Sequence, residues 1–263
     1  MRSIFKICGS LAIVSTSSVA LAAGSALKMV NWYDLLLRSG FGLDEELLSD
    51  WIPVAGAVFT LTVLVLVGLK FKSAMEKEGS EEIENRFSLR SVVEMLLDMV
   101  YNLGRDIIGP KYVSSYFPLL AGLFFFILIS NLSGLVPGFL PATDSINTNL
   151  AMGISVFLVY NYAGIKEHGV GYVKQFLGPV VFLMPLMLII ELIGHFARPI
   201  SLGLRLYGNI FGDHLVLSVF TGLTVLVFPA ALLFFGLLVA SLQSFVFTLL
   251  TSIYISMAVS HDH

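Results

Sequence analysis

The stretch "SLGLRLYGNIFGDH" (201–214) places groups capable of ion chemistry inside a strongly apolar part of the chain. It contains Arg205, Asn209, Asp213 and His214, and no formally charged residue follows until Asp262. Aspartate and histidine can bind and release protons near neutral pH, whereas arginine keeps its charge. A charge at the centre of a bilayer costs about 2.5–3.5 kcal/mol even on lenient scales. These side chains are therefore predicted to face protein or water.

A helix over 191–216 would bring the polar residues of this region to one side. At 3.6 residues per turn, six of them fall near a single stripe, opposite a face of Leu, Ile, Val and Phe: Glu191, His195, Arg198, Arg205, Asn209 and Asp213. The last apolar segment carries a matching face: Gly236, Ala240, Gln243, Phe247, Thr251 and Tyr254. Its small residues allow another backbone to come close. We expect the two helices to pack together.

Arg205 is the hardest of these residues to explain structurally. No acidic residue stands at 201, 202, 208 or 209, and Asp213 is about 12 Å along the helix. Its counter-charge is therefore expected on another helix or another subunit, and an internal structural salt bridge is the alternative. Arg198 could instead extend to the membrane interface beside Pro199, and His195 and His214 could be neutral histidines hydrogen-bonded within a helix bundle.

The composition indicates a polytopic α-helical membrane protein. The chain is 57% hydrophobic and 13% charged, with a mean hydropathy of +0.89, whereas soluble domains carry about 25% charged residues. Runs near 20 apolar residues are long enough to span a bilayer as helices. We predict an all-α fold of five to six hydrophobic helices that ends in a long helix hairpin, with a bend near 224–229 where Pro229 could begin the second helix.

Basic residues predict the topology, because short cytoplasmic loops are rich in Lys and Arg. They gather in 70–111 and in 166–174, and 134–148 has none. The N-terminus is then outside after signal removal and the C-terminus cytoplasmic. The predicted organisation is a signal peptide or N-terminal anchor over 1–23, an external segment over 24–50, a first transmembrane helix over 51–69, a cytoplasmic segment over 70–111, a transmembrane helix hairpin over 112–165, and final helices over 166–263 that end in the cytoplasm.

The cytoplasmic segment contains one amphipathic stretch, in which the apolar residues from Val92 to Leu103 recur at helical spacing. It is expected to form a helix on the membrane surface, a helix packed on a partner, or a plain connector.

Several classes of function are disfavoured. The single cysteine, Cys8, excludes an internal disulfide, and the net charge of −3 gives no argument for nucleic acid. No P-loop, Rossmann fingerprint or HExxH helix occurs, so no cofactor or metal is expected. The sequence contains no nucleophile–base–acid set placed at an aqueous surface, so the chain is not expected to be an enzyme by itself. A stand-alone channel or secondary transporter and a structural membrane anchor remain alternatives, although no inverted repeat supports the transporter.

Two stretches of this sequence are similar to a known family. "RPISLGLRLYGNIFGDHLVL" and "SLQSFVFTLLTSIYISMAVSHDH" resemble the a subunit (subunit 6) of the F-type ATP synthase membrane sector. "NLSGLVPGF" and "TDSINTNLAMGISVFLVY" resemble the hairpin that precedes them, so the likeness covers about 85–263.

This resemblance implies a role in a larger complex. The chain would be a stator subunit in a bacterial inner membrane, with two proton half-channels against a c-ring of proteolipid subunits and with peripheral-stalk b subunits as further partners. Arg205 would face the ring carboxylate, Asn209 and Gln243 would stand beside it, and Glu191 would line the path from the outer side.

The sequence departs from this family at two positions. His214, preceded by Asp213, stands where many members have glutamate, and Gly236 stands where some have histidine or glutamate. We expect a rearranged relay through Asp213 and His214, with Gly236 leaving room. Histidine relays protons and is a poor sodium ligand, so protons are favoured over sodium as the coupling ion.

Overall fold

The computed structural model describes residues 32–33, 36–37, 45–77, 89–136, 138–169, 171–172, 184–223 and 227–260. Over these residues the regular structure is helical, which confirms the all-α class. The elements are α3 (Glu45–Lys77), α4 (Leu89–Ile108), α5 (Val113–Gly134), the short 3-10 helix η1 (Ala142–Asp144), α6 (Ile146–His168), α8 (Met184–Leu223) and α9 (Val227–Val259). The predicted signal segment, 1–23, and most of 24–50 lie outside the described residues.

Four of the described helices are long and apolar enough to cross a membrane: Trp51–Ser73, Val113–Gly134, Leu186–Val216 and Ala231–Val259. The first contains the predicted span 51–69. Val58, Leu61 and Val65 of α3 are all exposed, as expected of a helix whose surroundings are lipid. The polytopic membrane class is thus confirmed.

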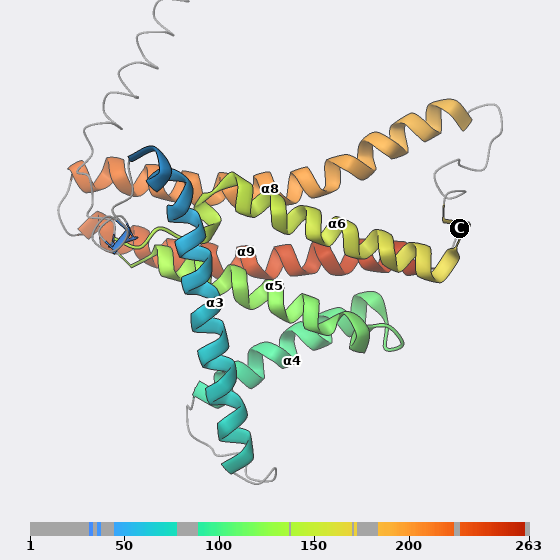
Figure 1. Ribbon diagram of the computed structural model, residues 1–263, viewed down its shortest axis with the longest axis horizontal. Coiled ribbons are helices and arrows are strands. Elements are labelled where there is room, and N and C mark those ends of the chain that lie inside the picture. The colour runs from blue at the N-terminus through green and yellow to red at the C-terminus, as the bar shows by residue number, and fades with distance from the viewer. Residues whose placement is uncertain are drawn as a thin grey trace, which may run out of the picture.

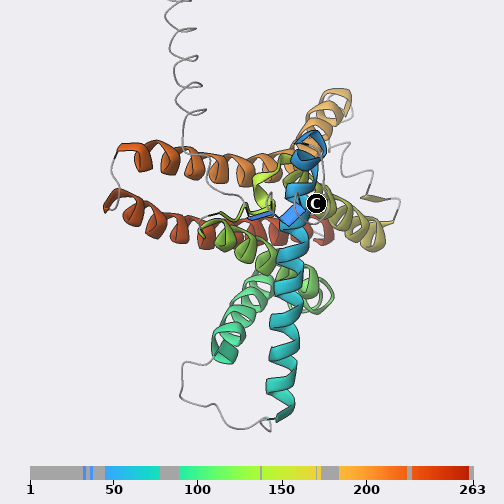
Figure 2. The same cartoon turned by 60° about the vertical axis from the view of Figure 1, so that its left-hand side comes forward.

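Helices α5, α6, α8 and α9 run alongside one another, and α3 crosses them at a steep angle (Figure 1). The same crossing is visible after rotation (Figure 2). Helix α9 lies between α5 and α6 and packs against both. Because α9 also contacts α8, the last helix forms the centre of the bundle.

The core follows from the apolar faces of these four helices. Its fully buried members are Leu120, Ile127, Val156, Leu206 and Ile255. Val100 brings α4 onto the same core, and α4 packs against α5 and α9. The predicted amphipathic helix is therefore present, and its apolar side meets the chain's own helices. The hydroxyl of Ser256 on α9 donates to the carbonyl of Ile107 on α4 at 2.7 Å.

Helices α6 and α8 approach each other through glycines. A Cβ built on Gly153 would lie 2.4 Å from the carbonyl oxygen of Pro199, and one on Gly203 would lie 3.0 Å from that of Asn149. These pairs run in opposite directions along the two helices, so α6 and α8 are antiparallel. Small residues allow such backbone contact, which fixes the register of α8 against α6.

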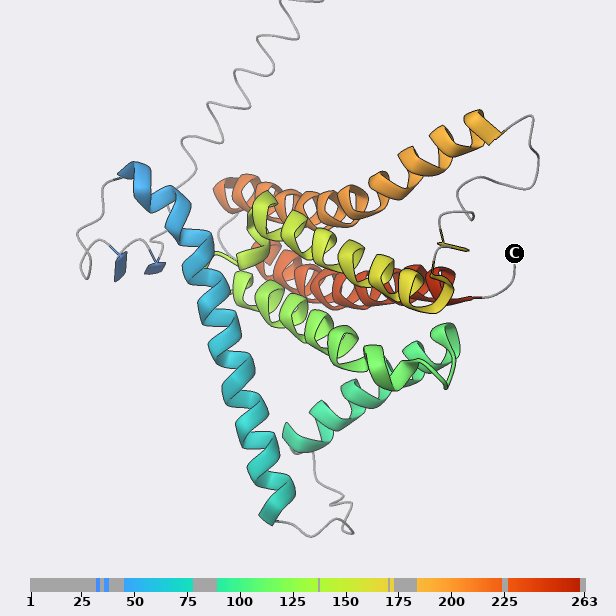
Figure 3. The same cartoon turned by 45° about the vertical axis from the view of Figure 1, so that its right-hand side comes forward.

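Pro199 interrupts the hydrogen bonding of α8. Proline has no N–H, so the carbonyl of His195 loses its helical donor. The hydroxyl of Tyr160 on α6 donates to that carbonyl at 3.4 Å instead. Helix α8 is bent along its length (Figure 3), and an interior proline is a known cause of such a bend.

Candidate functional site

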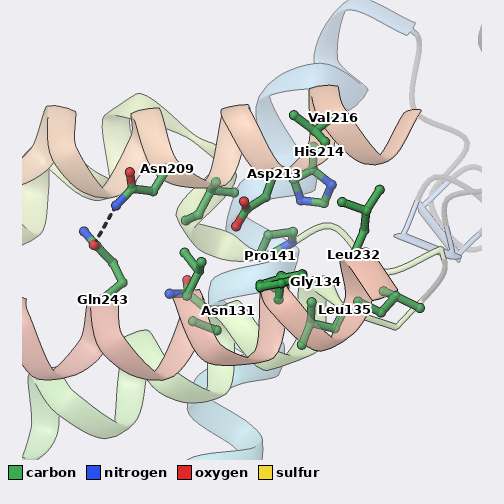
Figure 4. Close-up of a pocket in the computed structure, with 16 residues that line it drawn as sticks. Asn131, Gly134, Leu135, Pro141, Asn209, Asp213, His214, Val216, Leu232 and Gln243 are labelled. Carbon is green, nitrogen blue, oxygen red and sulfur yellow. Dashed lines mark hydrogen bonds between the residues drawn. The ribbon is translucent and has the colours of Figure 1, made fainter. Parts of the chain in front are cut away.

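Two of the predicted polar residues pair directly across α8 and α9. The amide nitrogen of Asn209 donates to the side-chain oxygen of Gln243 at 2.7 Å, as Figure 4 shows. Gln243 is buried, and its own amide nitrogen has no hydrogen-bond partner among the described residues. A buried donor without a partner costs free energy unless water or another molecule satisfies it.

A cavity of about 120 Å³ opens beside this pair, between α8, α9 and the end of α5. Its polar side chains are Asn131, Asn209, Asp213, His214 and Gln243. In Figure 4, Asp213 and His214 project from α8 toward the space between the helices. The remaining lining is largely aliphatic. A cavity of this size has room for several water molecules, which the five polar side chains could hold by hydrogen bonds.

Arg205 lies on α8 one helical turn before Asn209, on the same stripe. Its side chain is exposed, and it forms no hydrogen bond or ion pair with any residue that the structure describes. Arg205 is therefore an exposed cation without a partner among the described residues, beside the Asn209–Gln243 pair.

A second polar cluster lies on the N-terminal side of Arg205, between α6 and α8. Asn161 donates its amide nitrogen to the carbonyl of Phe157 at 2.7 Å, so its oxygen is left for His195 Nε2, 2.9 Å away. The imidazole therefore donates from Nε2. The hydroxyl of Tyr160 lies 3.4 Å from Nδ1, the acceptor nitrogen. His195 is buried here, turned out of the polar stripe toward α6.

Arg198 and Tyr254, two further residues of the predicted polar faces, lie close to this cluster. The guanidinium of Arg198 stands over the ring of Tyr254, 5.5 Å from its centroid. Tyr254 also contacts Tyr160, with ring centroids 6.0 Å apart. A cation over an aromatic face is stabilised by the ring quadrupole, which restrains Arg198. The predicted residues thus form two groups along α8, separated by Arg205.

Glu191 does not line the cavity, and it lies near the opposite end of α8 from the cavity. It is exposed and lies about 35 Å along the helix from His214. Because α6 and α8 are antiparallel, Glu191 lies toward the same end as His168 of α6, next to the basic loop 166–174. Under the predicted topology this end is cytoplasmic, so the expectation that Glu191 lines the path from the outer side and the predicted topology do not agree with each other.

Gly236 lines the cavity opposite Leu135. A Cβ added there would lie 2.8 Å from the Cδ2 atom of Leu135, the end of a flexible side chain that also lines the cavity. That Gly236 leaves room for the relay stays a prediction.

Sequence reasoning missed Asn131 and Asn161. Asn131 is buried at the end of α5 and lines the cavity, and Asn161 holds His195. Each could have been found as an amide side chain inside an apolar helix, because burying an amide is costly unless it is hydrogen-bonded. No group of three or more metal-ligating residues occurs within the described parts of the chain.

The fold and site define a class of protein: a polytopic helical membrane protein with protonatable groups on both sides of an exposed arginine. The family model described as ATP synthase A chain matches residues 56–256. ATP synthase subunit a of Bdellovibrio bacteriovorus is 47% identical over 235 residues, which cover 89% of this chain and 99% of the relative.

Two further relatives agree with this assignment. ATP synthase subunit a 2 of Syntrophotalea carbinolica is 49% identical over 240 residues, covering 89% of this chain and 97% of the relative. Subunit a of Geotalea daltonii is 42% identical over 202 residues, covering 77% and 87%. The chain belongs to the ATP synthase subunit a family, the stator, proton-translocating subunit of the membrane sector, and is a component of that complex in a bacterial inner membrane.

Proposed function

We propose that Arg205 is the group of this stator subunit that makes a carboxylic acid on a rotating ring of proteolipid subunits release its proton. The observation that carries the proposal is an exposed arginine in a membrane-spanning helix, without a partner among the described residues. A protein surface that slides past this face needs a carboxylate at the same depth to meet the cation. The chain then carries no covalent chemistry of its own.

The charge of Arg205 sets the protonation of that carboxylate. A carboxylic acid must be neutral to pass through lipid, and a nearby permanent cation lowers its pKa so that it releases the proton. Lysine is a poorer choice because it can lose its charge when desolvated. The same cation repels protons and so prevents a direct leak between the two groups of polar residues.

We assign those two groups to opposite half-channels. The cavity with Asp213 and His214 lies about 12 Å of helix beyond Arg205, and the His195 cluster lies about 15 Å before it. With 134–148 outside and 166–174 cytoplasmic, the cavity forms the outer half-channel. His195, Arg198 and Glu191 then lie along the cytoplasmic half-channel. Histidines in both paths favour protons over sodium.

Arg205→Ala tests the proposal in inverted membrane vesicles. We expect ATP-driven acidification to be abolished while the complex still assembles, and Arg205→Lys to fail as well. Arg105→Ala, an exposed arginine on α4, is the matched control and should pump normally. Acidification at the normal rate by Arg205→Ala would show that the assigned role is wrong.

The partners and the ion need separate measurements. Native purification should recover this chain with a small proteolipid ring and with peripheral-stalk b subunits, whereas a stand-alone channel would purify without them. Strong activation of ATP hydrolysis by sodium at alkaline pH would contradict the proton assignment. Cysteines introduced in 134–148 and 166–174 should react with an impermeant thiol reagent from opposite sides of the membrane.

A further inference from the structure

Thr143 is a fully buried residue of η1 that hydrogen-bonds to one wall of the cavity. Its hydroxyl oxygen lies 2.7 Å from the side-chain oxygen of Asn131 and 3.2 Å from the hydroxyl oxygen of Ser130. Its backbone N–H donates to the hydroxyl of Ser130 at 3.3 Å, and the amide of Asn149 on α6 donates to its carbonyl at 2.7 Å. Thr143 therefore joins η1 to the end of α5 and to the start of α6.

These contacts determine the direction in which the two hydroxyls donate. Ser130 is fully buried, and the only acceptor for its proton among the described residues is the hydroxyl oxygen of Thr143. The hydroxyl of Thr143 must then donate to Asn131. In the reverse order, the amide of Asn131 would donate to Thr143 and Thr143 to Ser130. That order would leave the proton of Ser130 buried without an acceptor, which costs free energy.

The direction of donation fixes which atom of Asn131 faces the cavity. Its side-chain oxygen is occupied by Thr143, and its amide nitrogen has no hydrogen-bond partner among the described residues. Asn131 lines the cavity, across the space from Asp213 in Figure 4. An amide nitrogen donates two hydrogen bonds and accepts none. Asn131 therefore offers donors to whatever occupies the cavity.

A donor at this place is what the carboxyl of Asp213 lacks. Asp213 accepts no hydrogen bond from any residue that the structure describes, and the amide of Asn209 beside it already donates to Gln243. An ionised carboxylate only accepts hydrogen bonds, and N–H donors form its stronger ones. The amide nitrogen of Asn131 is a donor on the same cavity that is held in place and not yet used.

We propose that Thr143 is a positioning residue of the proton path. It holds the amide of Asn131 with its nitrogen toward the cavity, where the N–H group hydrogen-bonds through water to the carboxylate of Asp213. This inference rests on the proposed function of the cavity as a half-channel. Neither Thr143 nor Asn131 gains or loses a proton in this role. The hydrogen bond solvates the charge that remains on Asp213 after its proton has moved on.

The first test compares Thr143→Val and Thr143→Ser in the complete ATP synthase in vesicles. Valine keeps the shape of threonine without its hydroxyl, so the two orientations of the Asn131 amide are no longer distinguished. We expect potential-driven proton flux to fall about tenfold, as for loss of one hydrogen bond to a charged group, and serine to retain most of it. Thr62→Val on α3 is the matched control, because that exposed hydroxyl donates only to the carbonyl of Val58 in its own helix.

The second test asks whether Thr143 acts through Asn131. In an Asn131→Ala background, Thr143→Val should lower the flux little further, whereas a merely structural role would lower it by the same factor in both backgrounds. Equal factors, or normal flux in Thr143→Val, would overturn this inference. If Thr143→Val does not assemble, Asn131→Asp replaces it, since that side chain still accepts from Thr143 but has no N–H; normal flux there would also overturn the inference. The proposed function fails separately, if Arg205→Ala pumps normally.

Discussion

Replacing Gly153 with alanine should separate α6 from α8. The new Cβ would lie 2.4 Å from the carbonyl oxygen of Pro199 and 3.2 Å from its carbonyl carbon. Both atoms belong to the backbone of a helix, so no side chain can turn away to relieve the contact. The two helices must move apart by about 1 Å to restore an ordinary separation of about 3.5 Å.

The loss in the free energy of unfolding comes from the packing contacts that this separation of the helices weakens. A gap of 0.5–1 Å loses about a quarter to a half of the dispersion energy of each contact at the crossing, where Leu202 and Leu206 are buried. Overpacking of a well-packed site costs about 1–3 kcal/mol. Because the clash here is between backbones, we expect a loss of about 3 kcal/mol in the free energy of unfolding, at the upper end of that range.

The assay is SDS-induced unfolding of the purified chain in mixed micelles, followed by tryptophan fluorescence. Gly122→Ala on α5 is the matched control, because no described heavy atom outside its own stretch of helix lies within 4 Å of its Cβ position. Removing a helical glycine there should stabilise the chain by up to about 1 kcal/mol. If Gly153→Ala and Gly122→Ala unfold at the same SDS fraction, α6 and α8 do not touch as described and the reasoning is refuted.

Three other perturbations have defined outcomes. Asp213→Asn and His214→Ala should each reduce proton flux, and the double variant should lose about as much as the worse single one, because groups that act as a unit are not additive; additive losses would contradict a shared relay. Gly236→His should impair assembly because Leu135 fills the space, and Leu135→Ala should restore it; Gly236→His complexes that assemble normally alone would contradict this packing. Burial raises the folded-state pKa of Asp144 above 3.8, so the folded chain binds more protons than the unfolded chain and stability should fall as pH rises from that value through the folded pKa. Asp144→Asn should remove that part of the pH dependence of SDS unfolding, and an unchanged profile would show that the carboxyl is not buried.

The helices were predictable because each apolar run has the length of a membrane span, and the residues of α8 share a face because 3.6 residues make a turn. The placement of His195 could not be predicted from the sequence. His195 lies at the edge of that stripe, and it is buried because α6 packs against it and Asn161 accepts its hydrogen bond. Asn131 lines the cavity from the end of α5, and Pro141 lines it from the loop before α6, whose path depends on contacts with α3 and α5. Leu135 enters the space at Gly236 for the same reason, and helix periodicity carries no information about it.

The crossing of α3 with α8 and α9 determines how distance along the chain relates to distance across the membrane. The span Trp51–Ser73 is about 35 Å long, which matches an upright crossing of a hydrocarbon core of about 30 Å. Helix α8 has 40 residues, or about 60 Å, and cannot stand upright in the same layer.

Helix α8 therefore lies strongly inclined beside α9, and the two polar groups that flank Arg205 are offset sideways as well as in depth. Under the proposed assignment of these groups to opposite half-channels, a proton that enters through one group leaves through the other only after lateral transport in the plane of the bilayer. A voltage applied along the membrane normal would then drive a tangential displacement of whatever carries the proton past the arginine, which is the condition for producing torque.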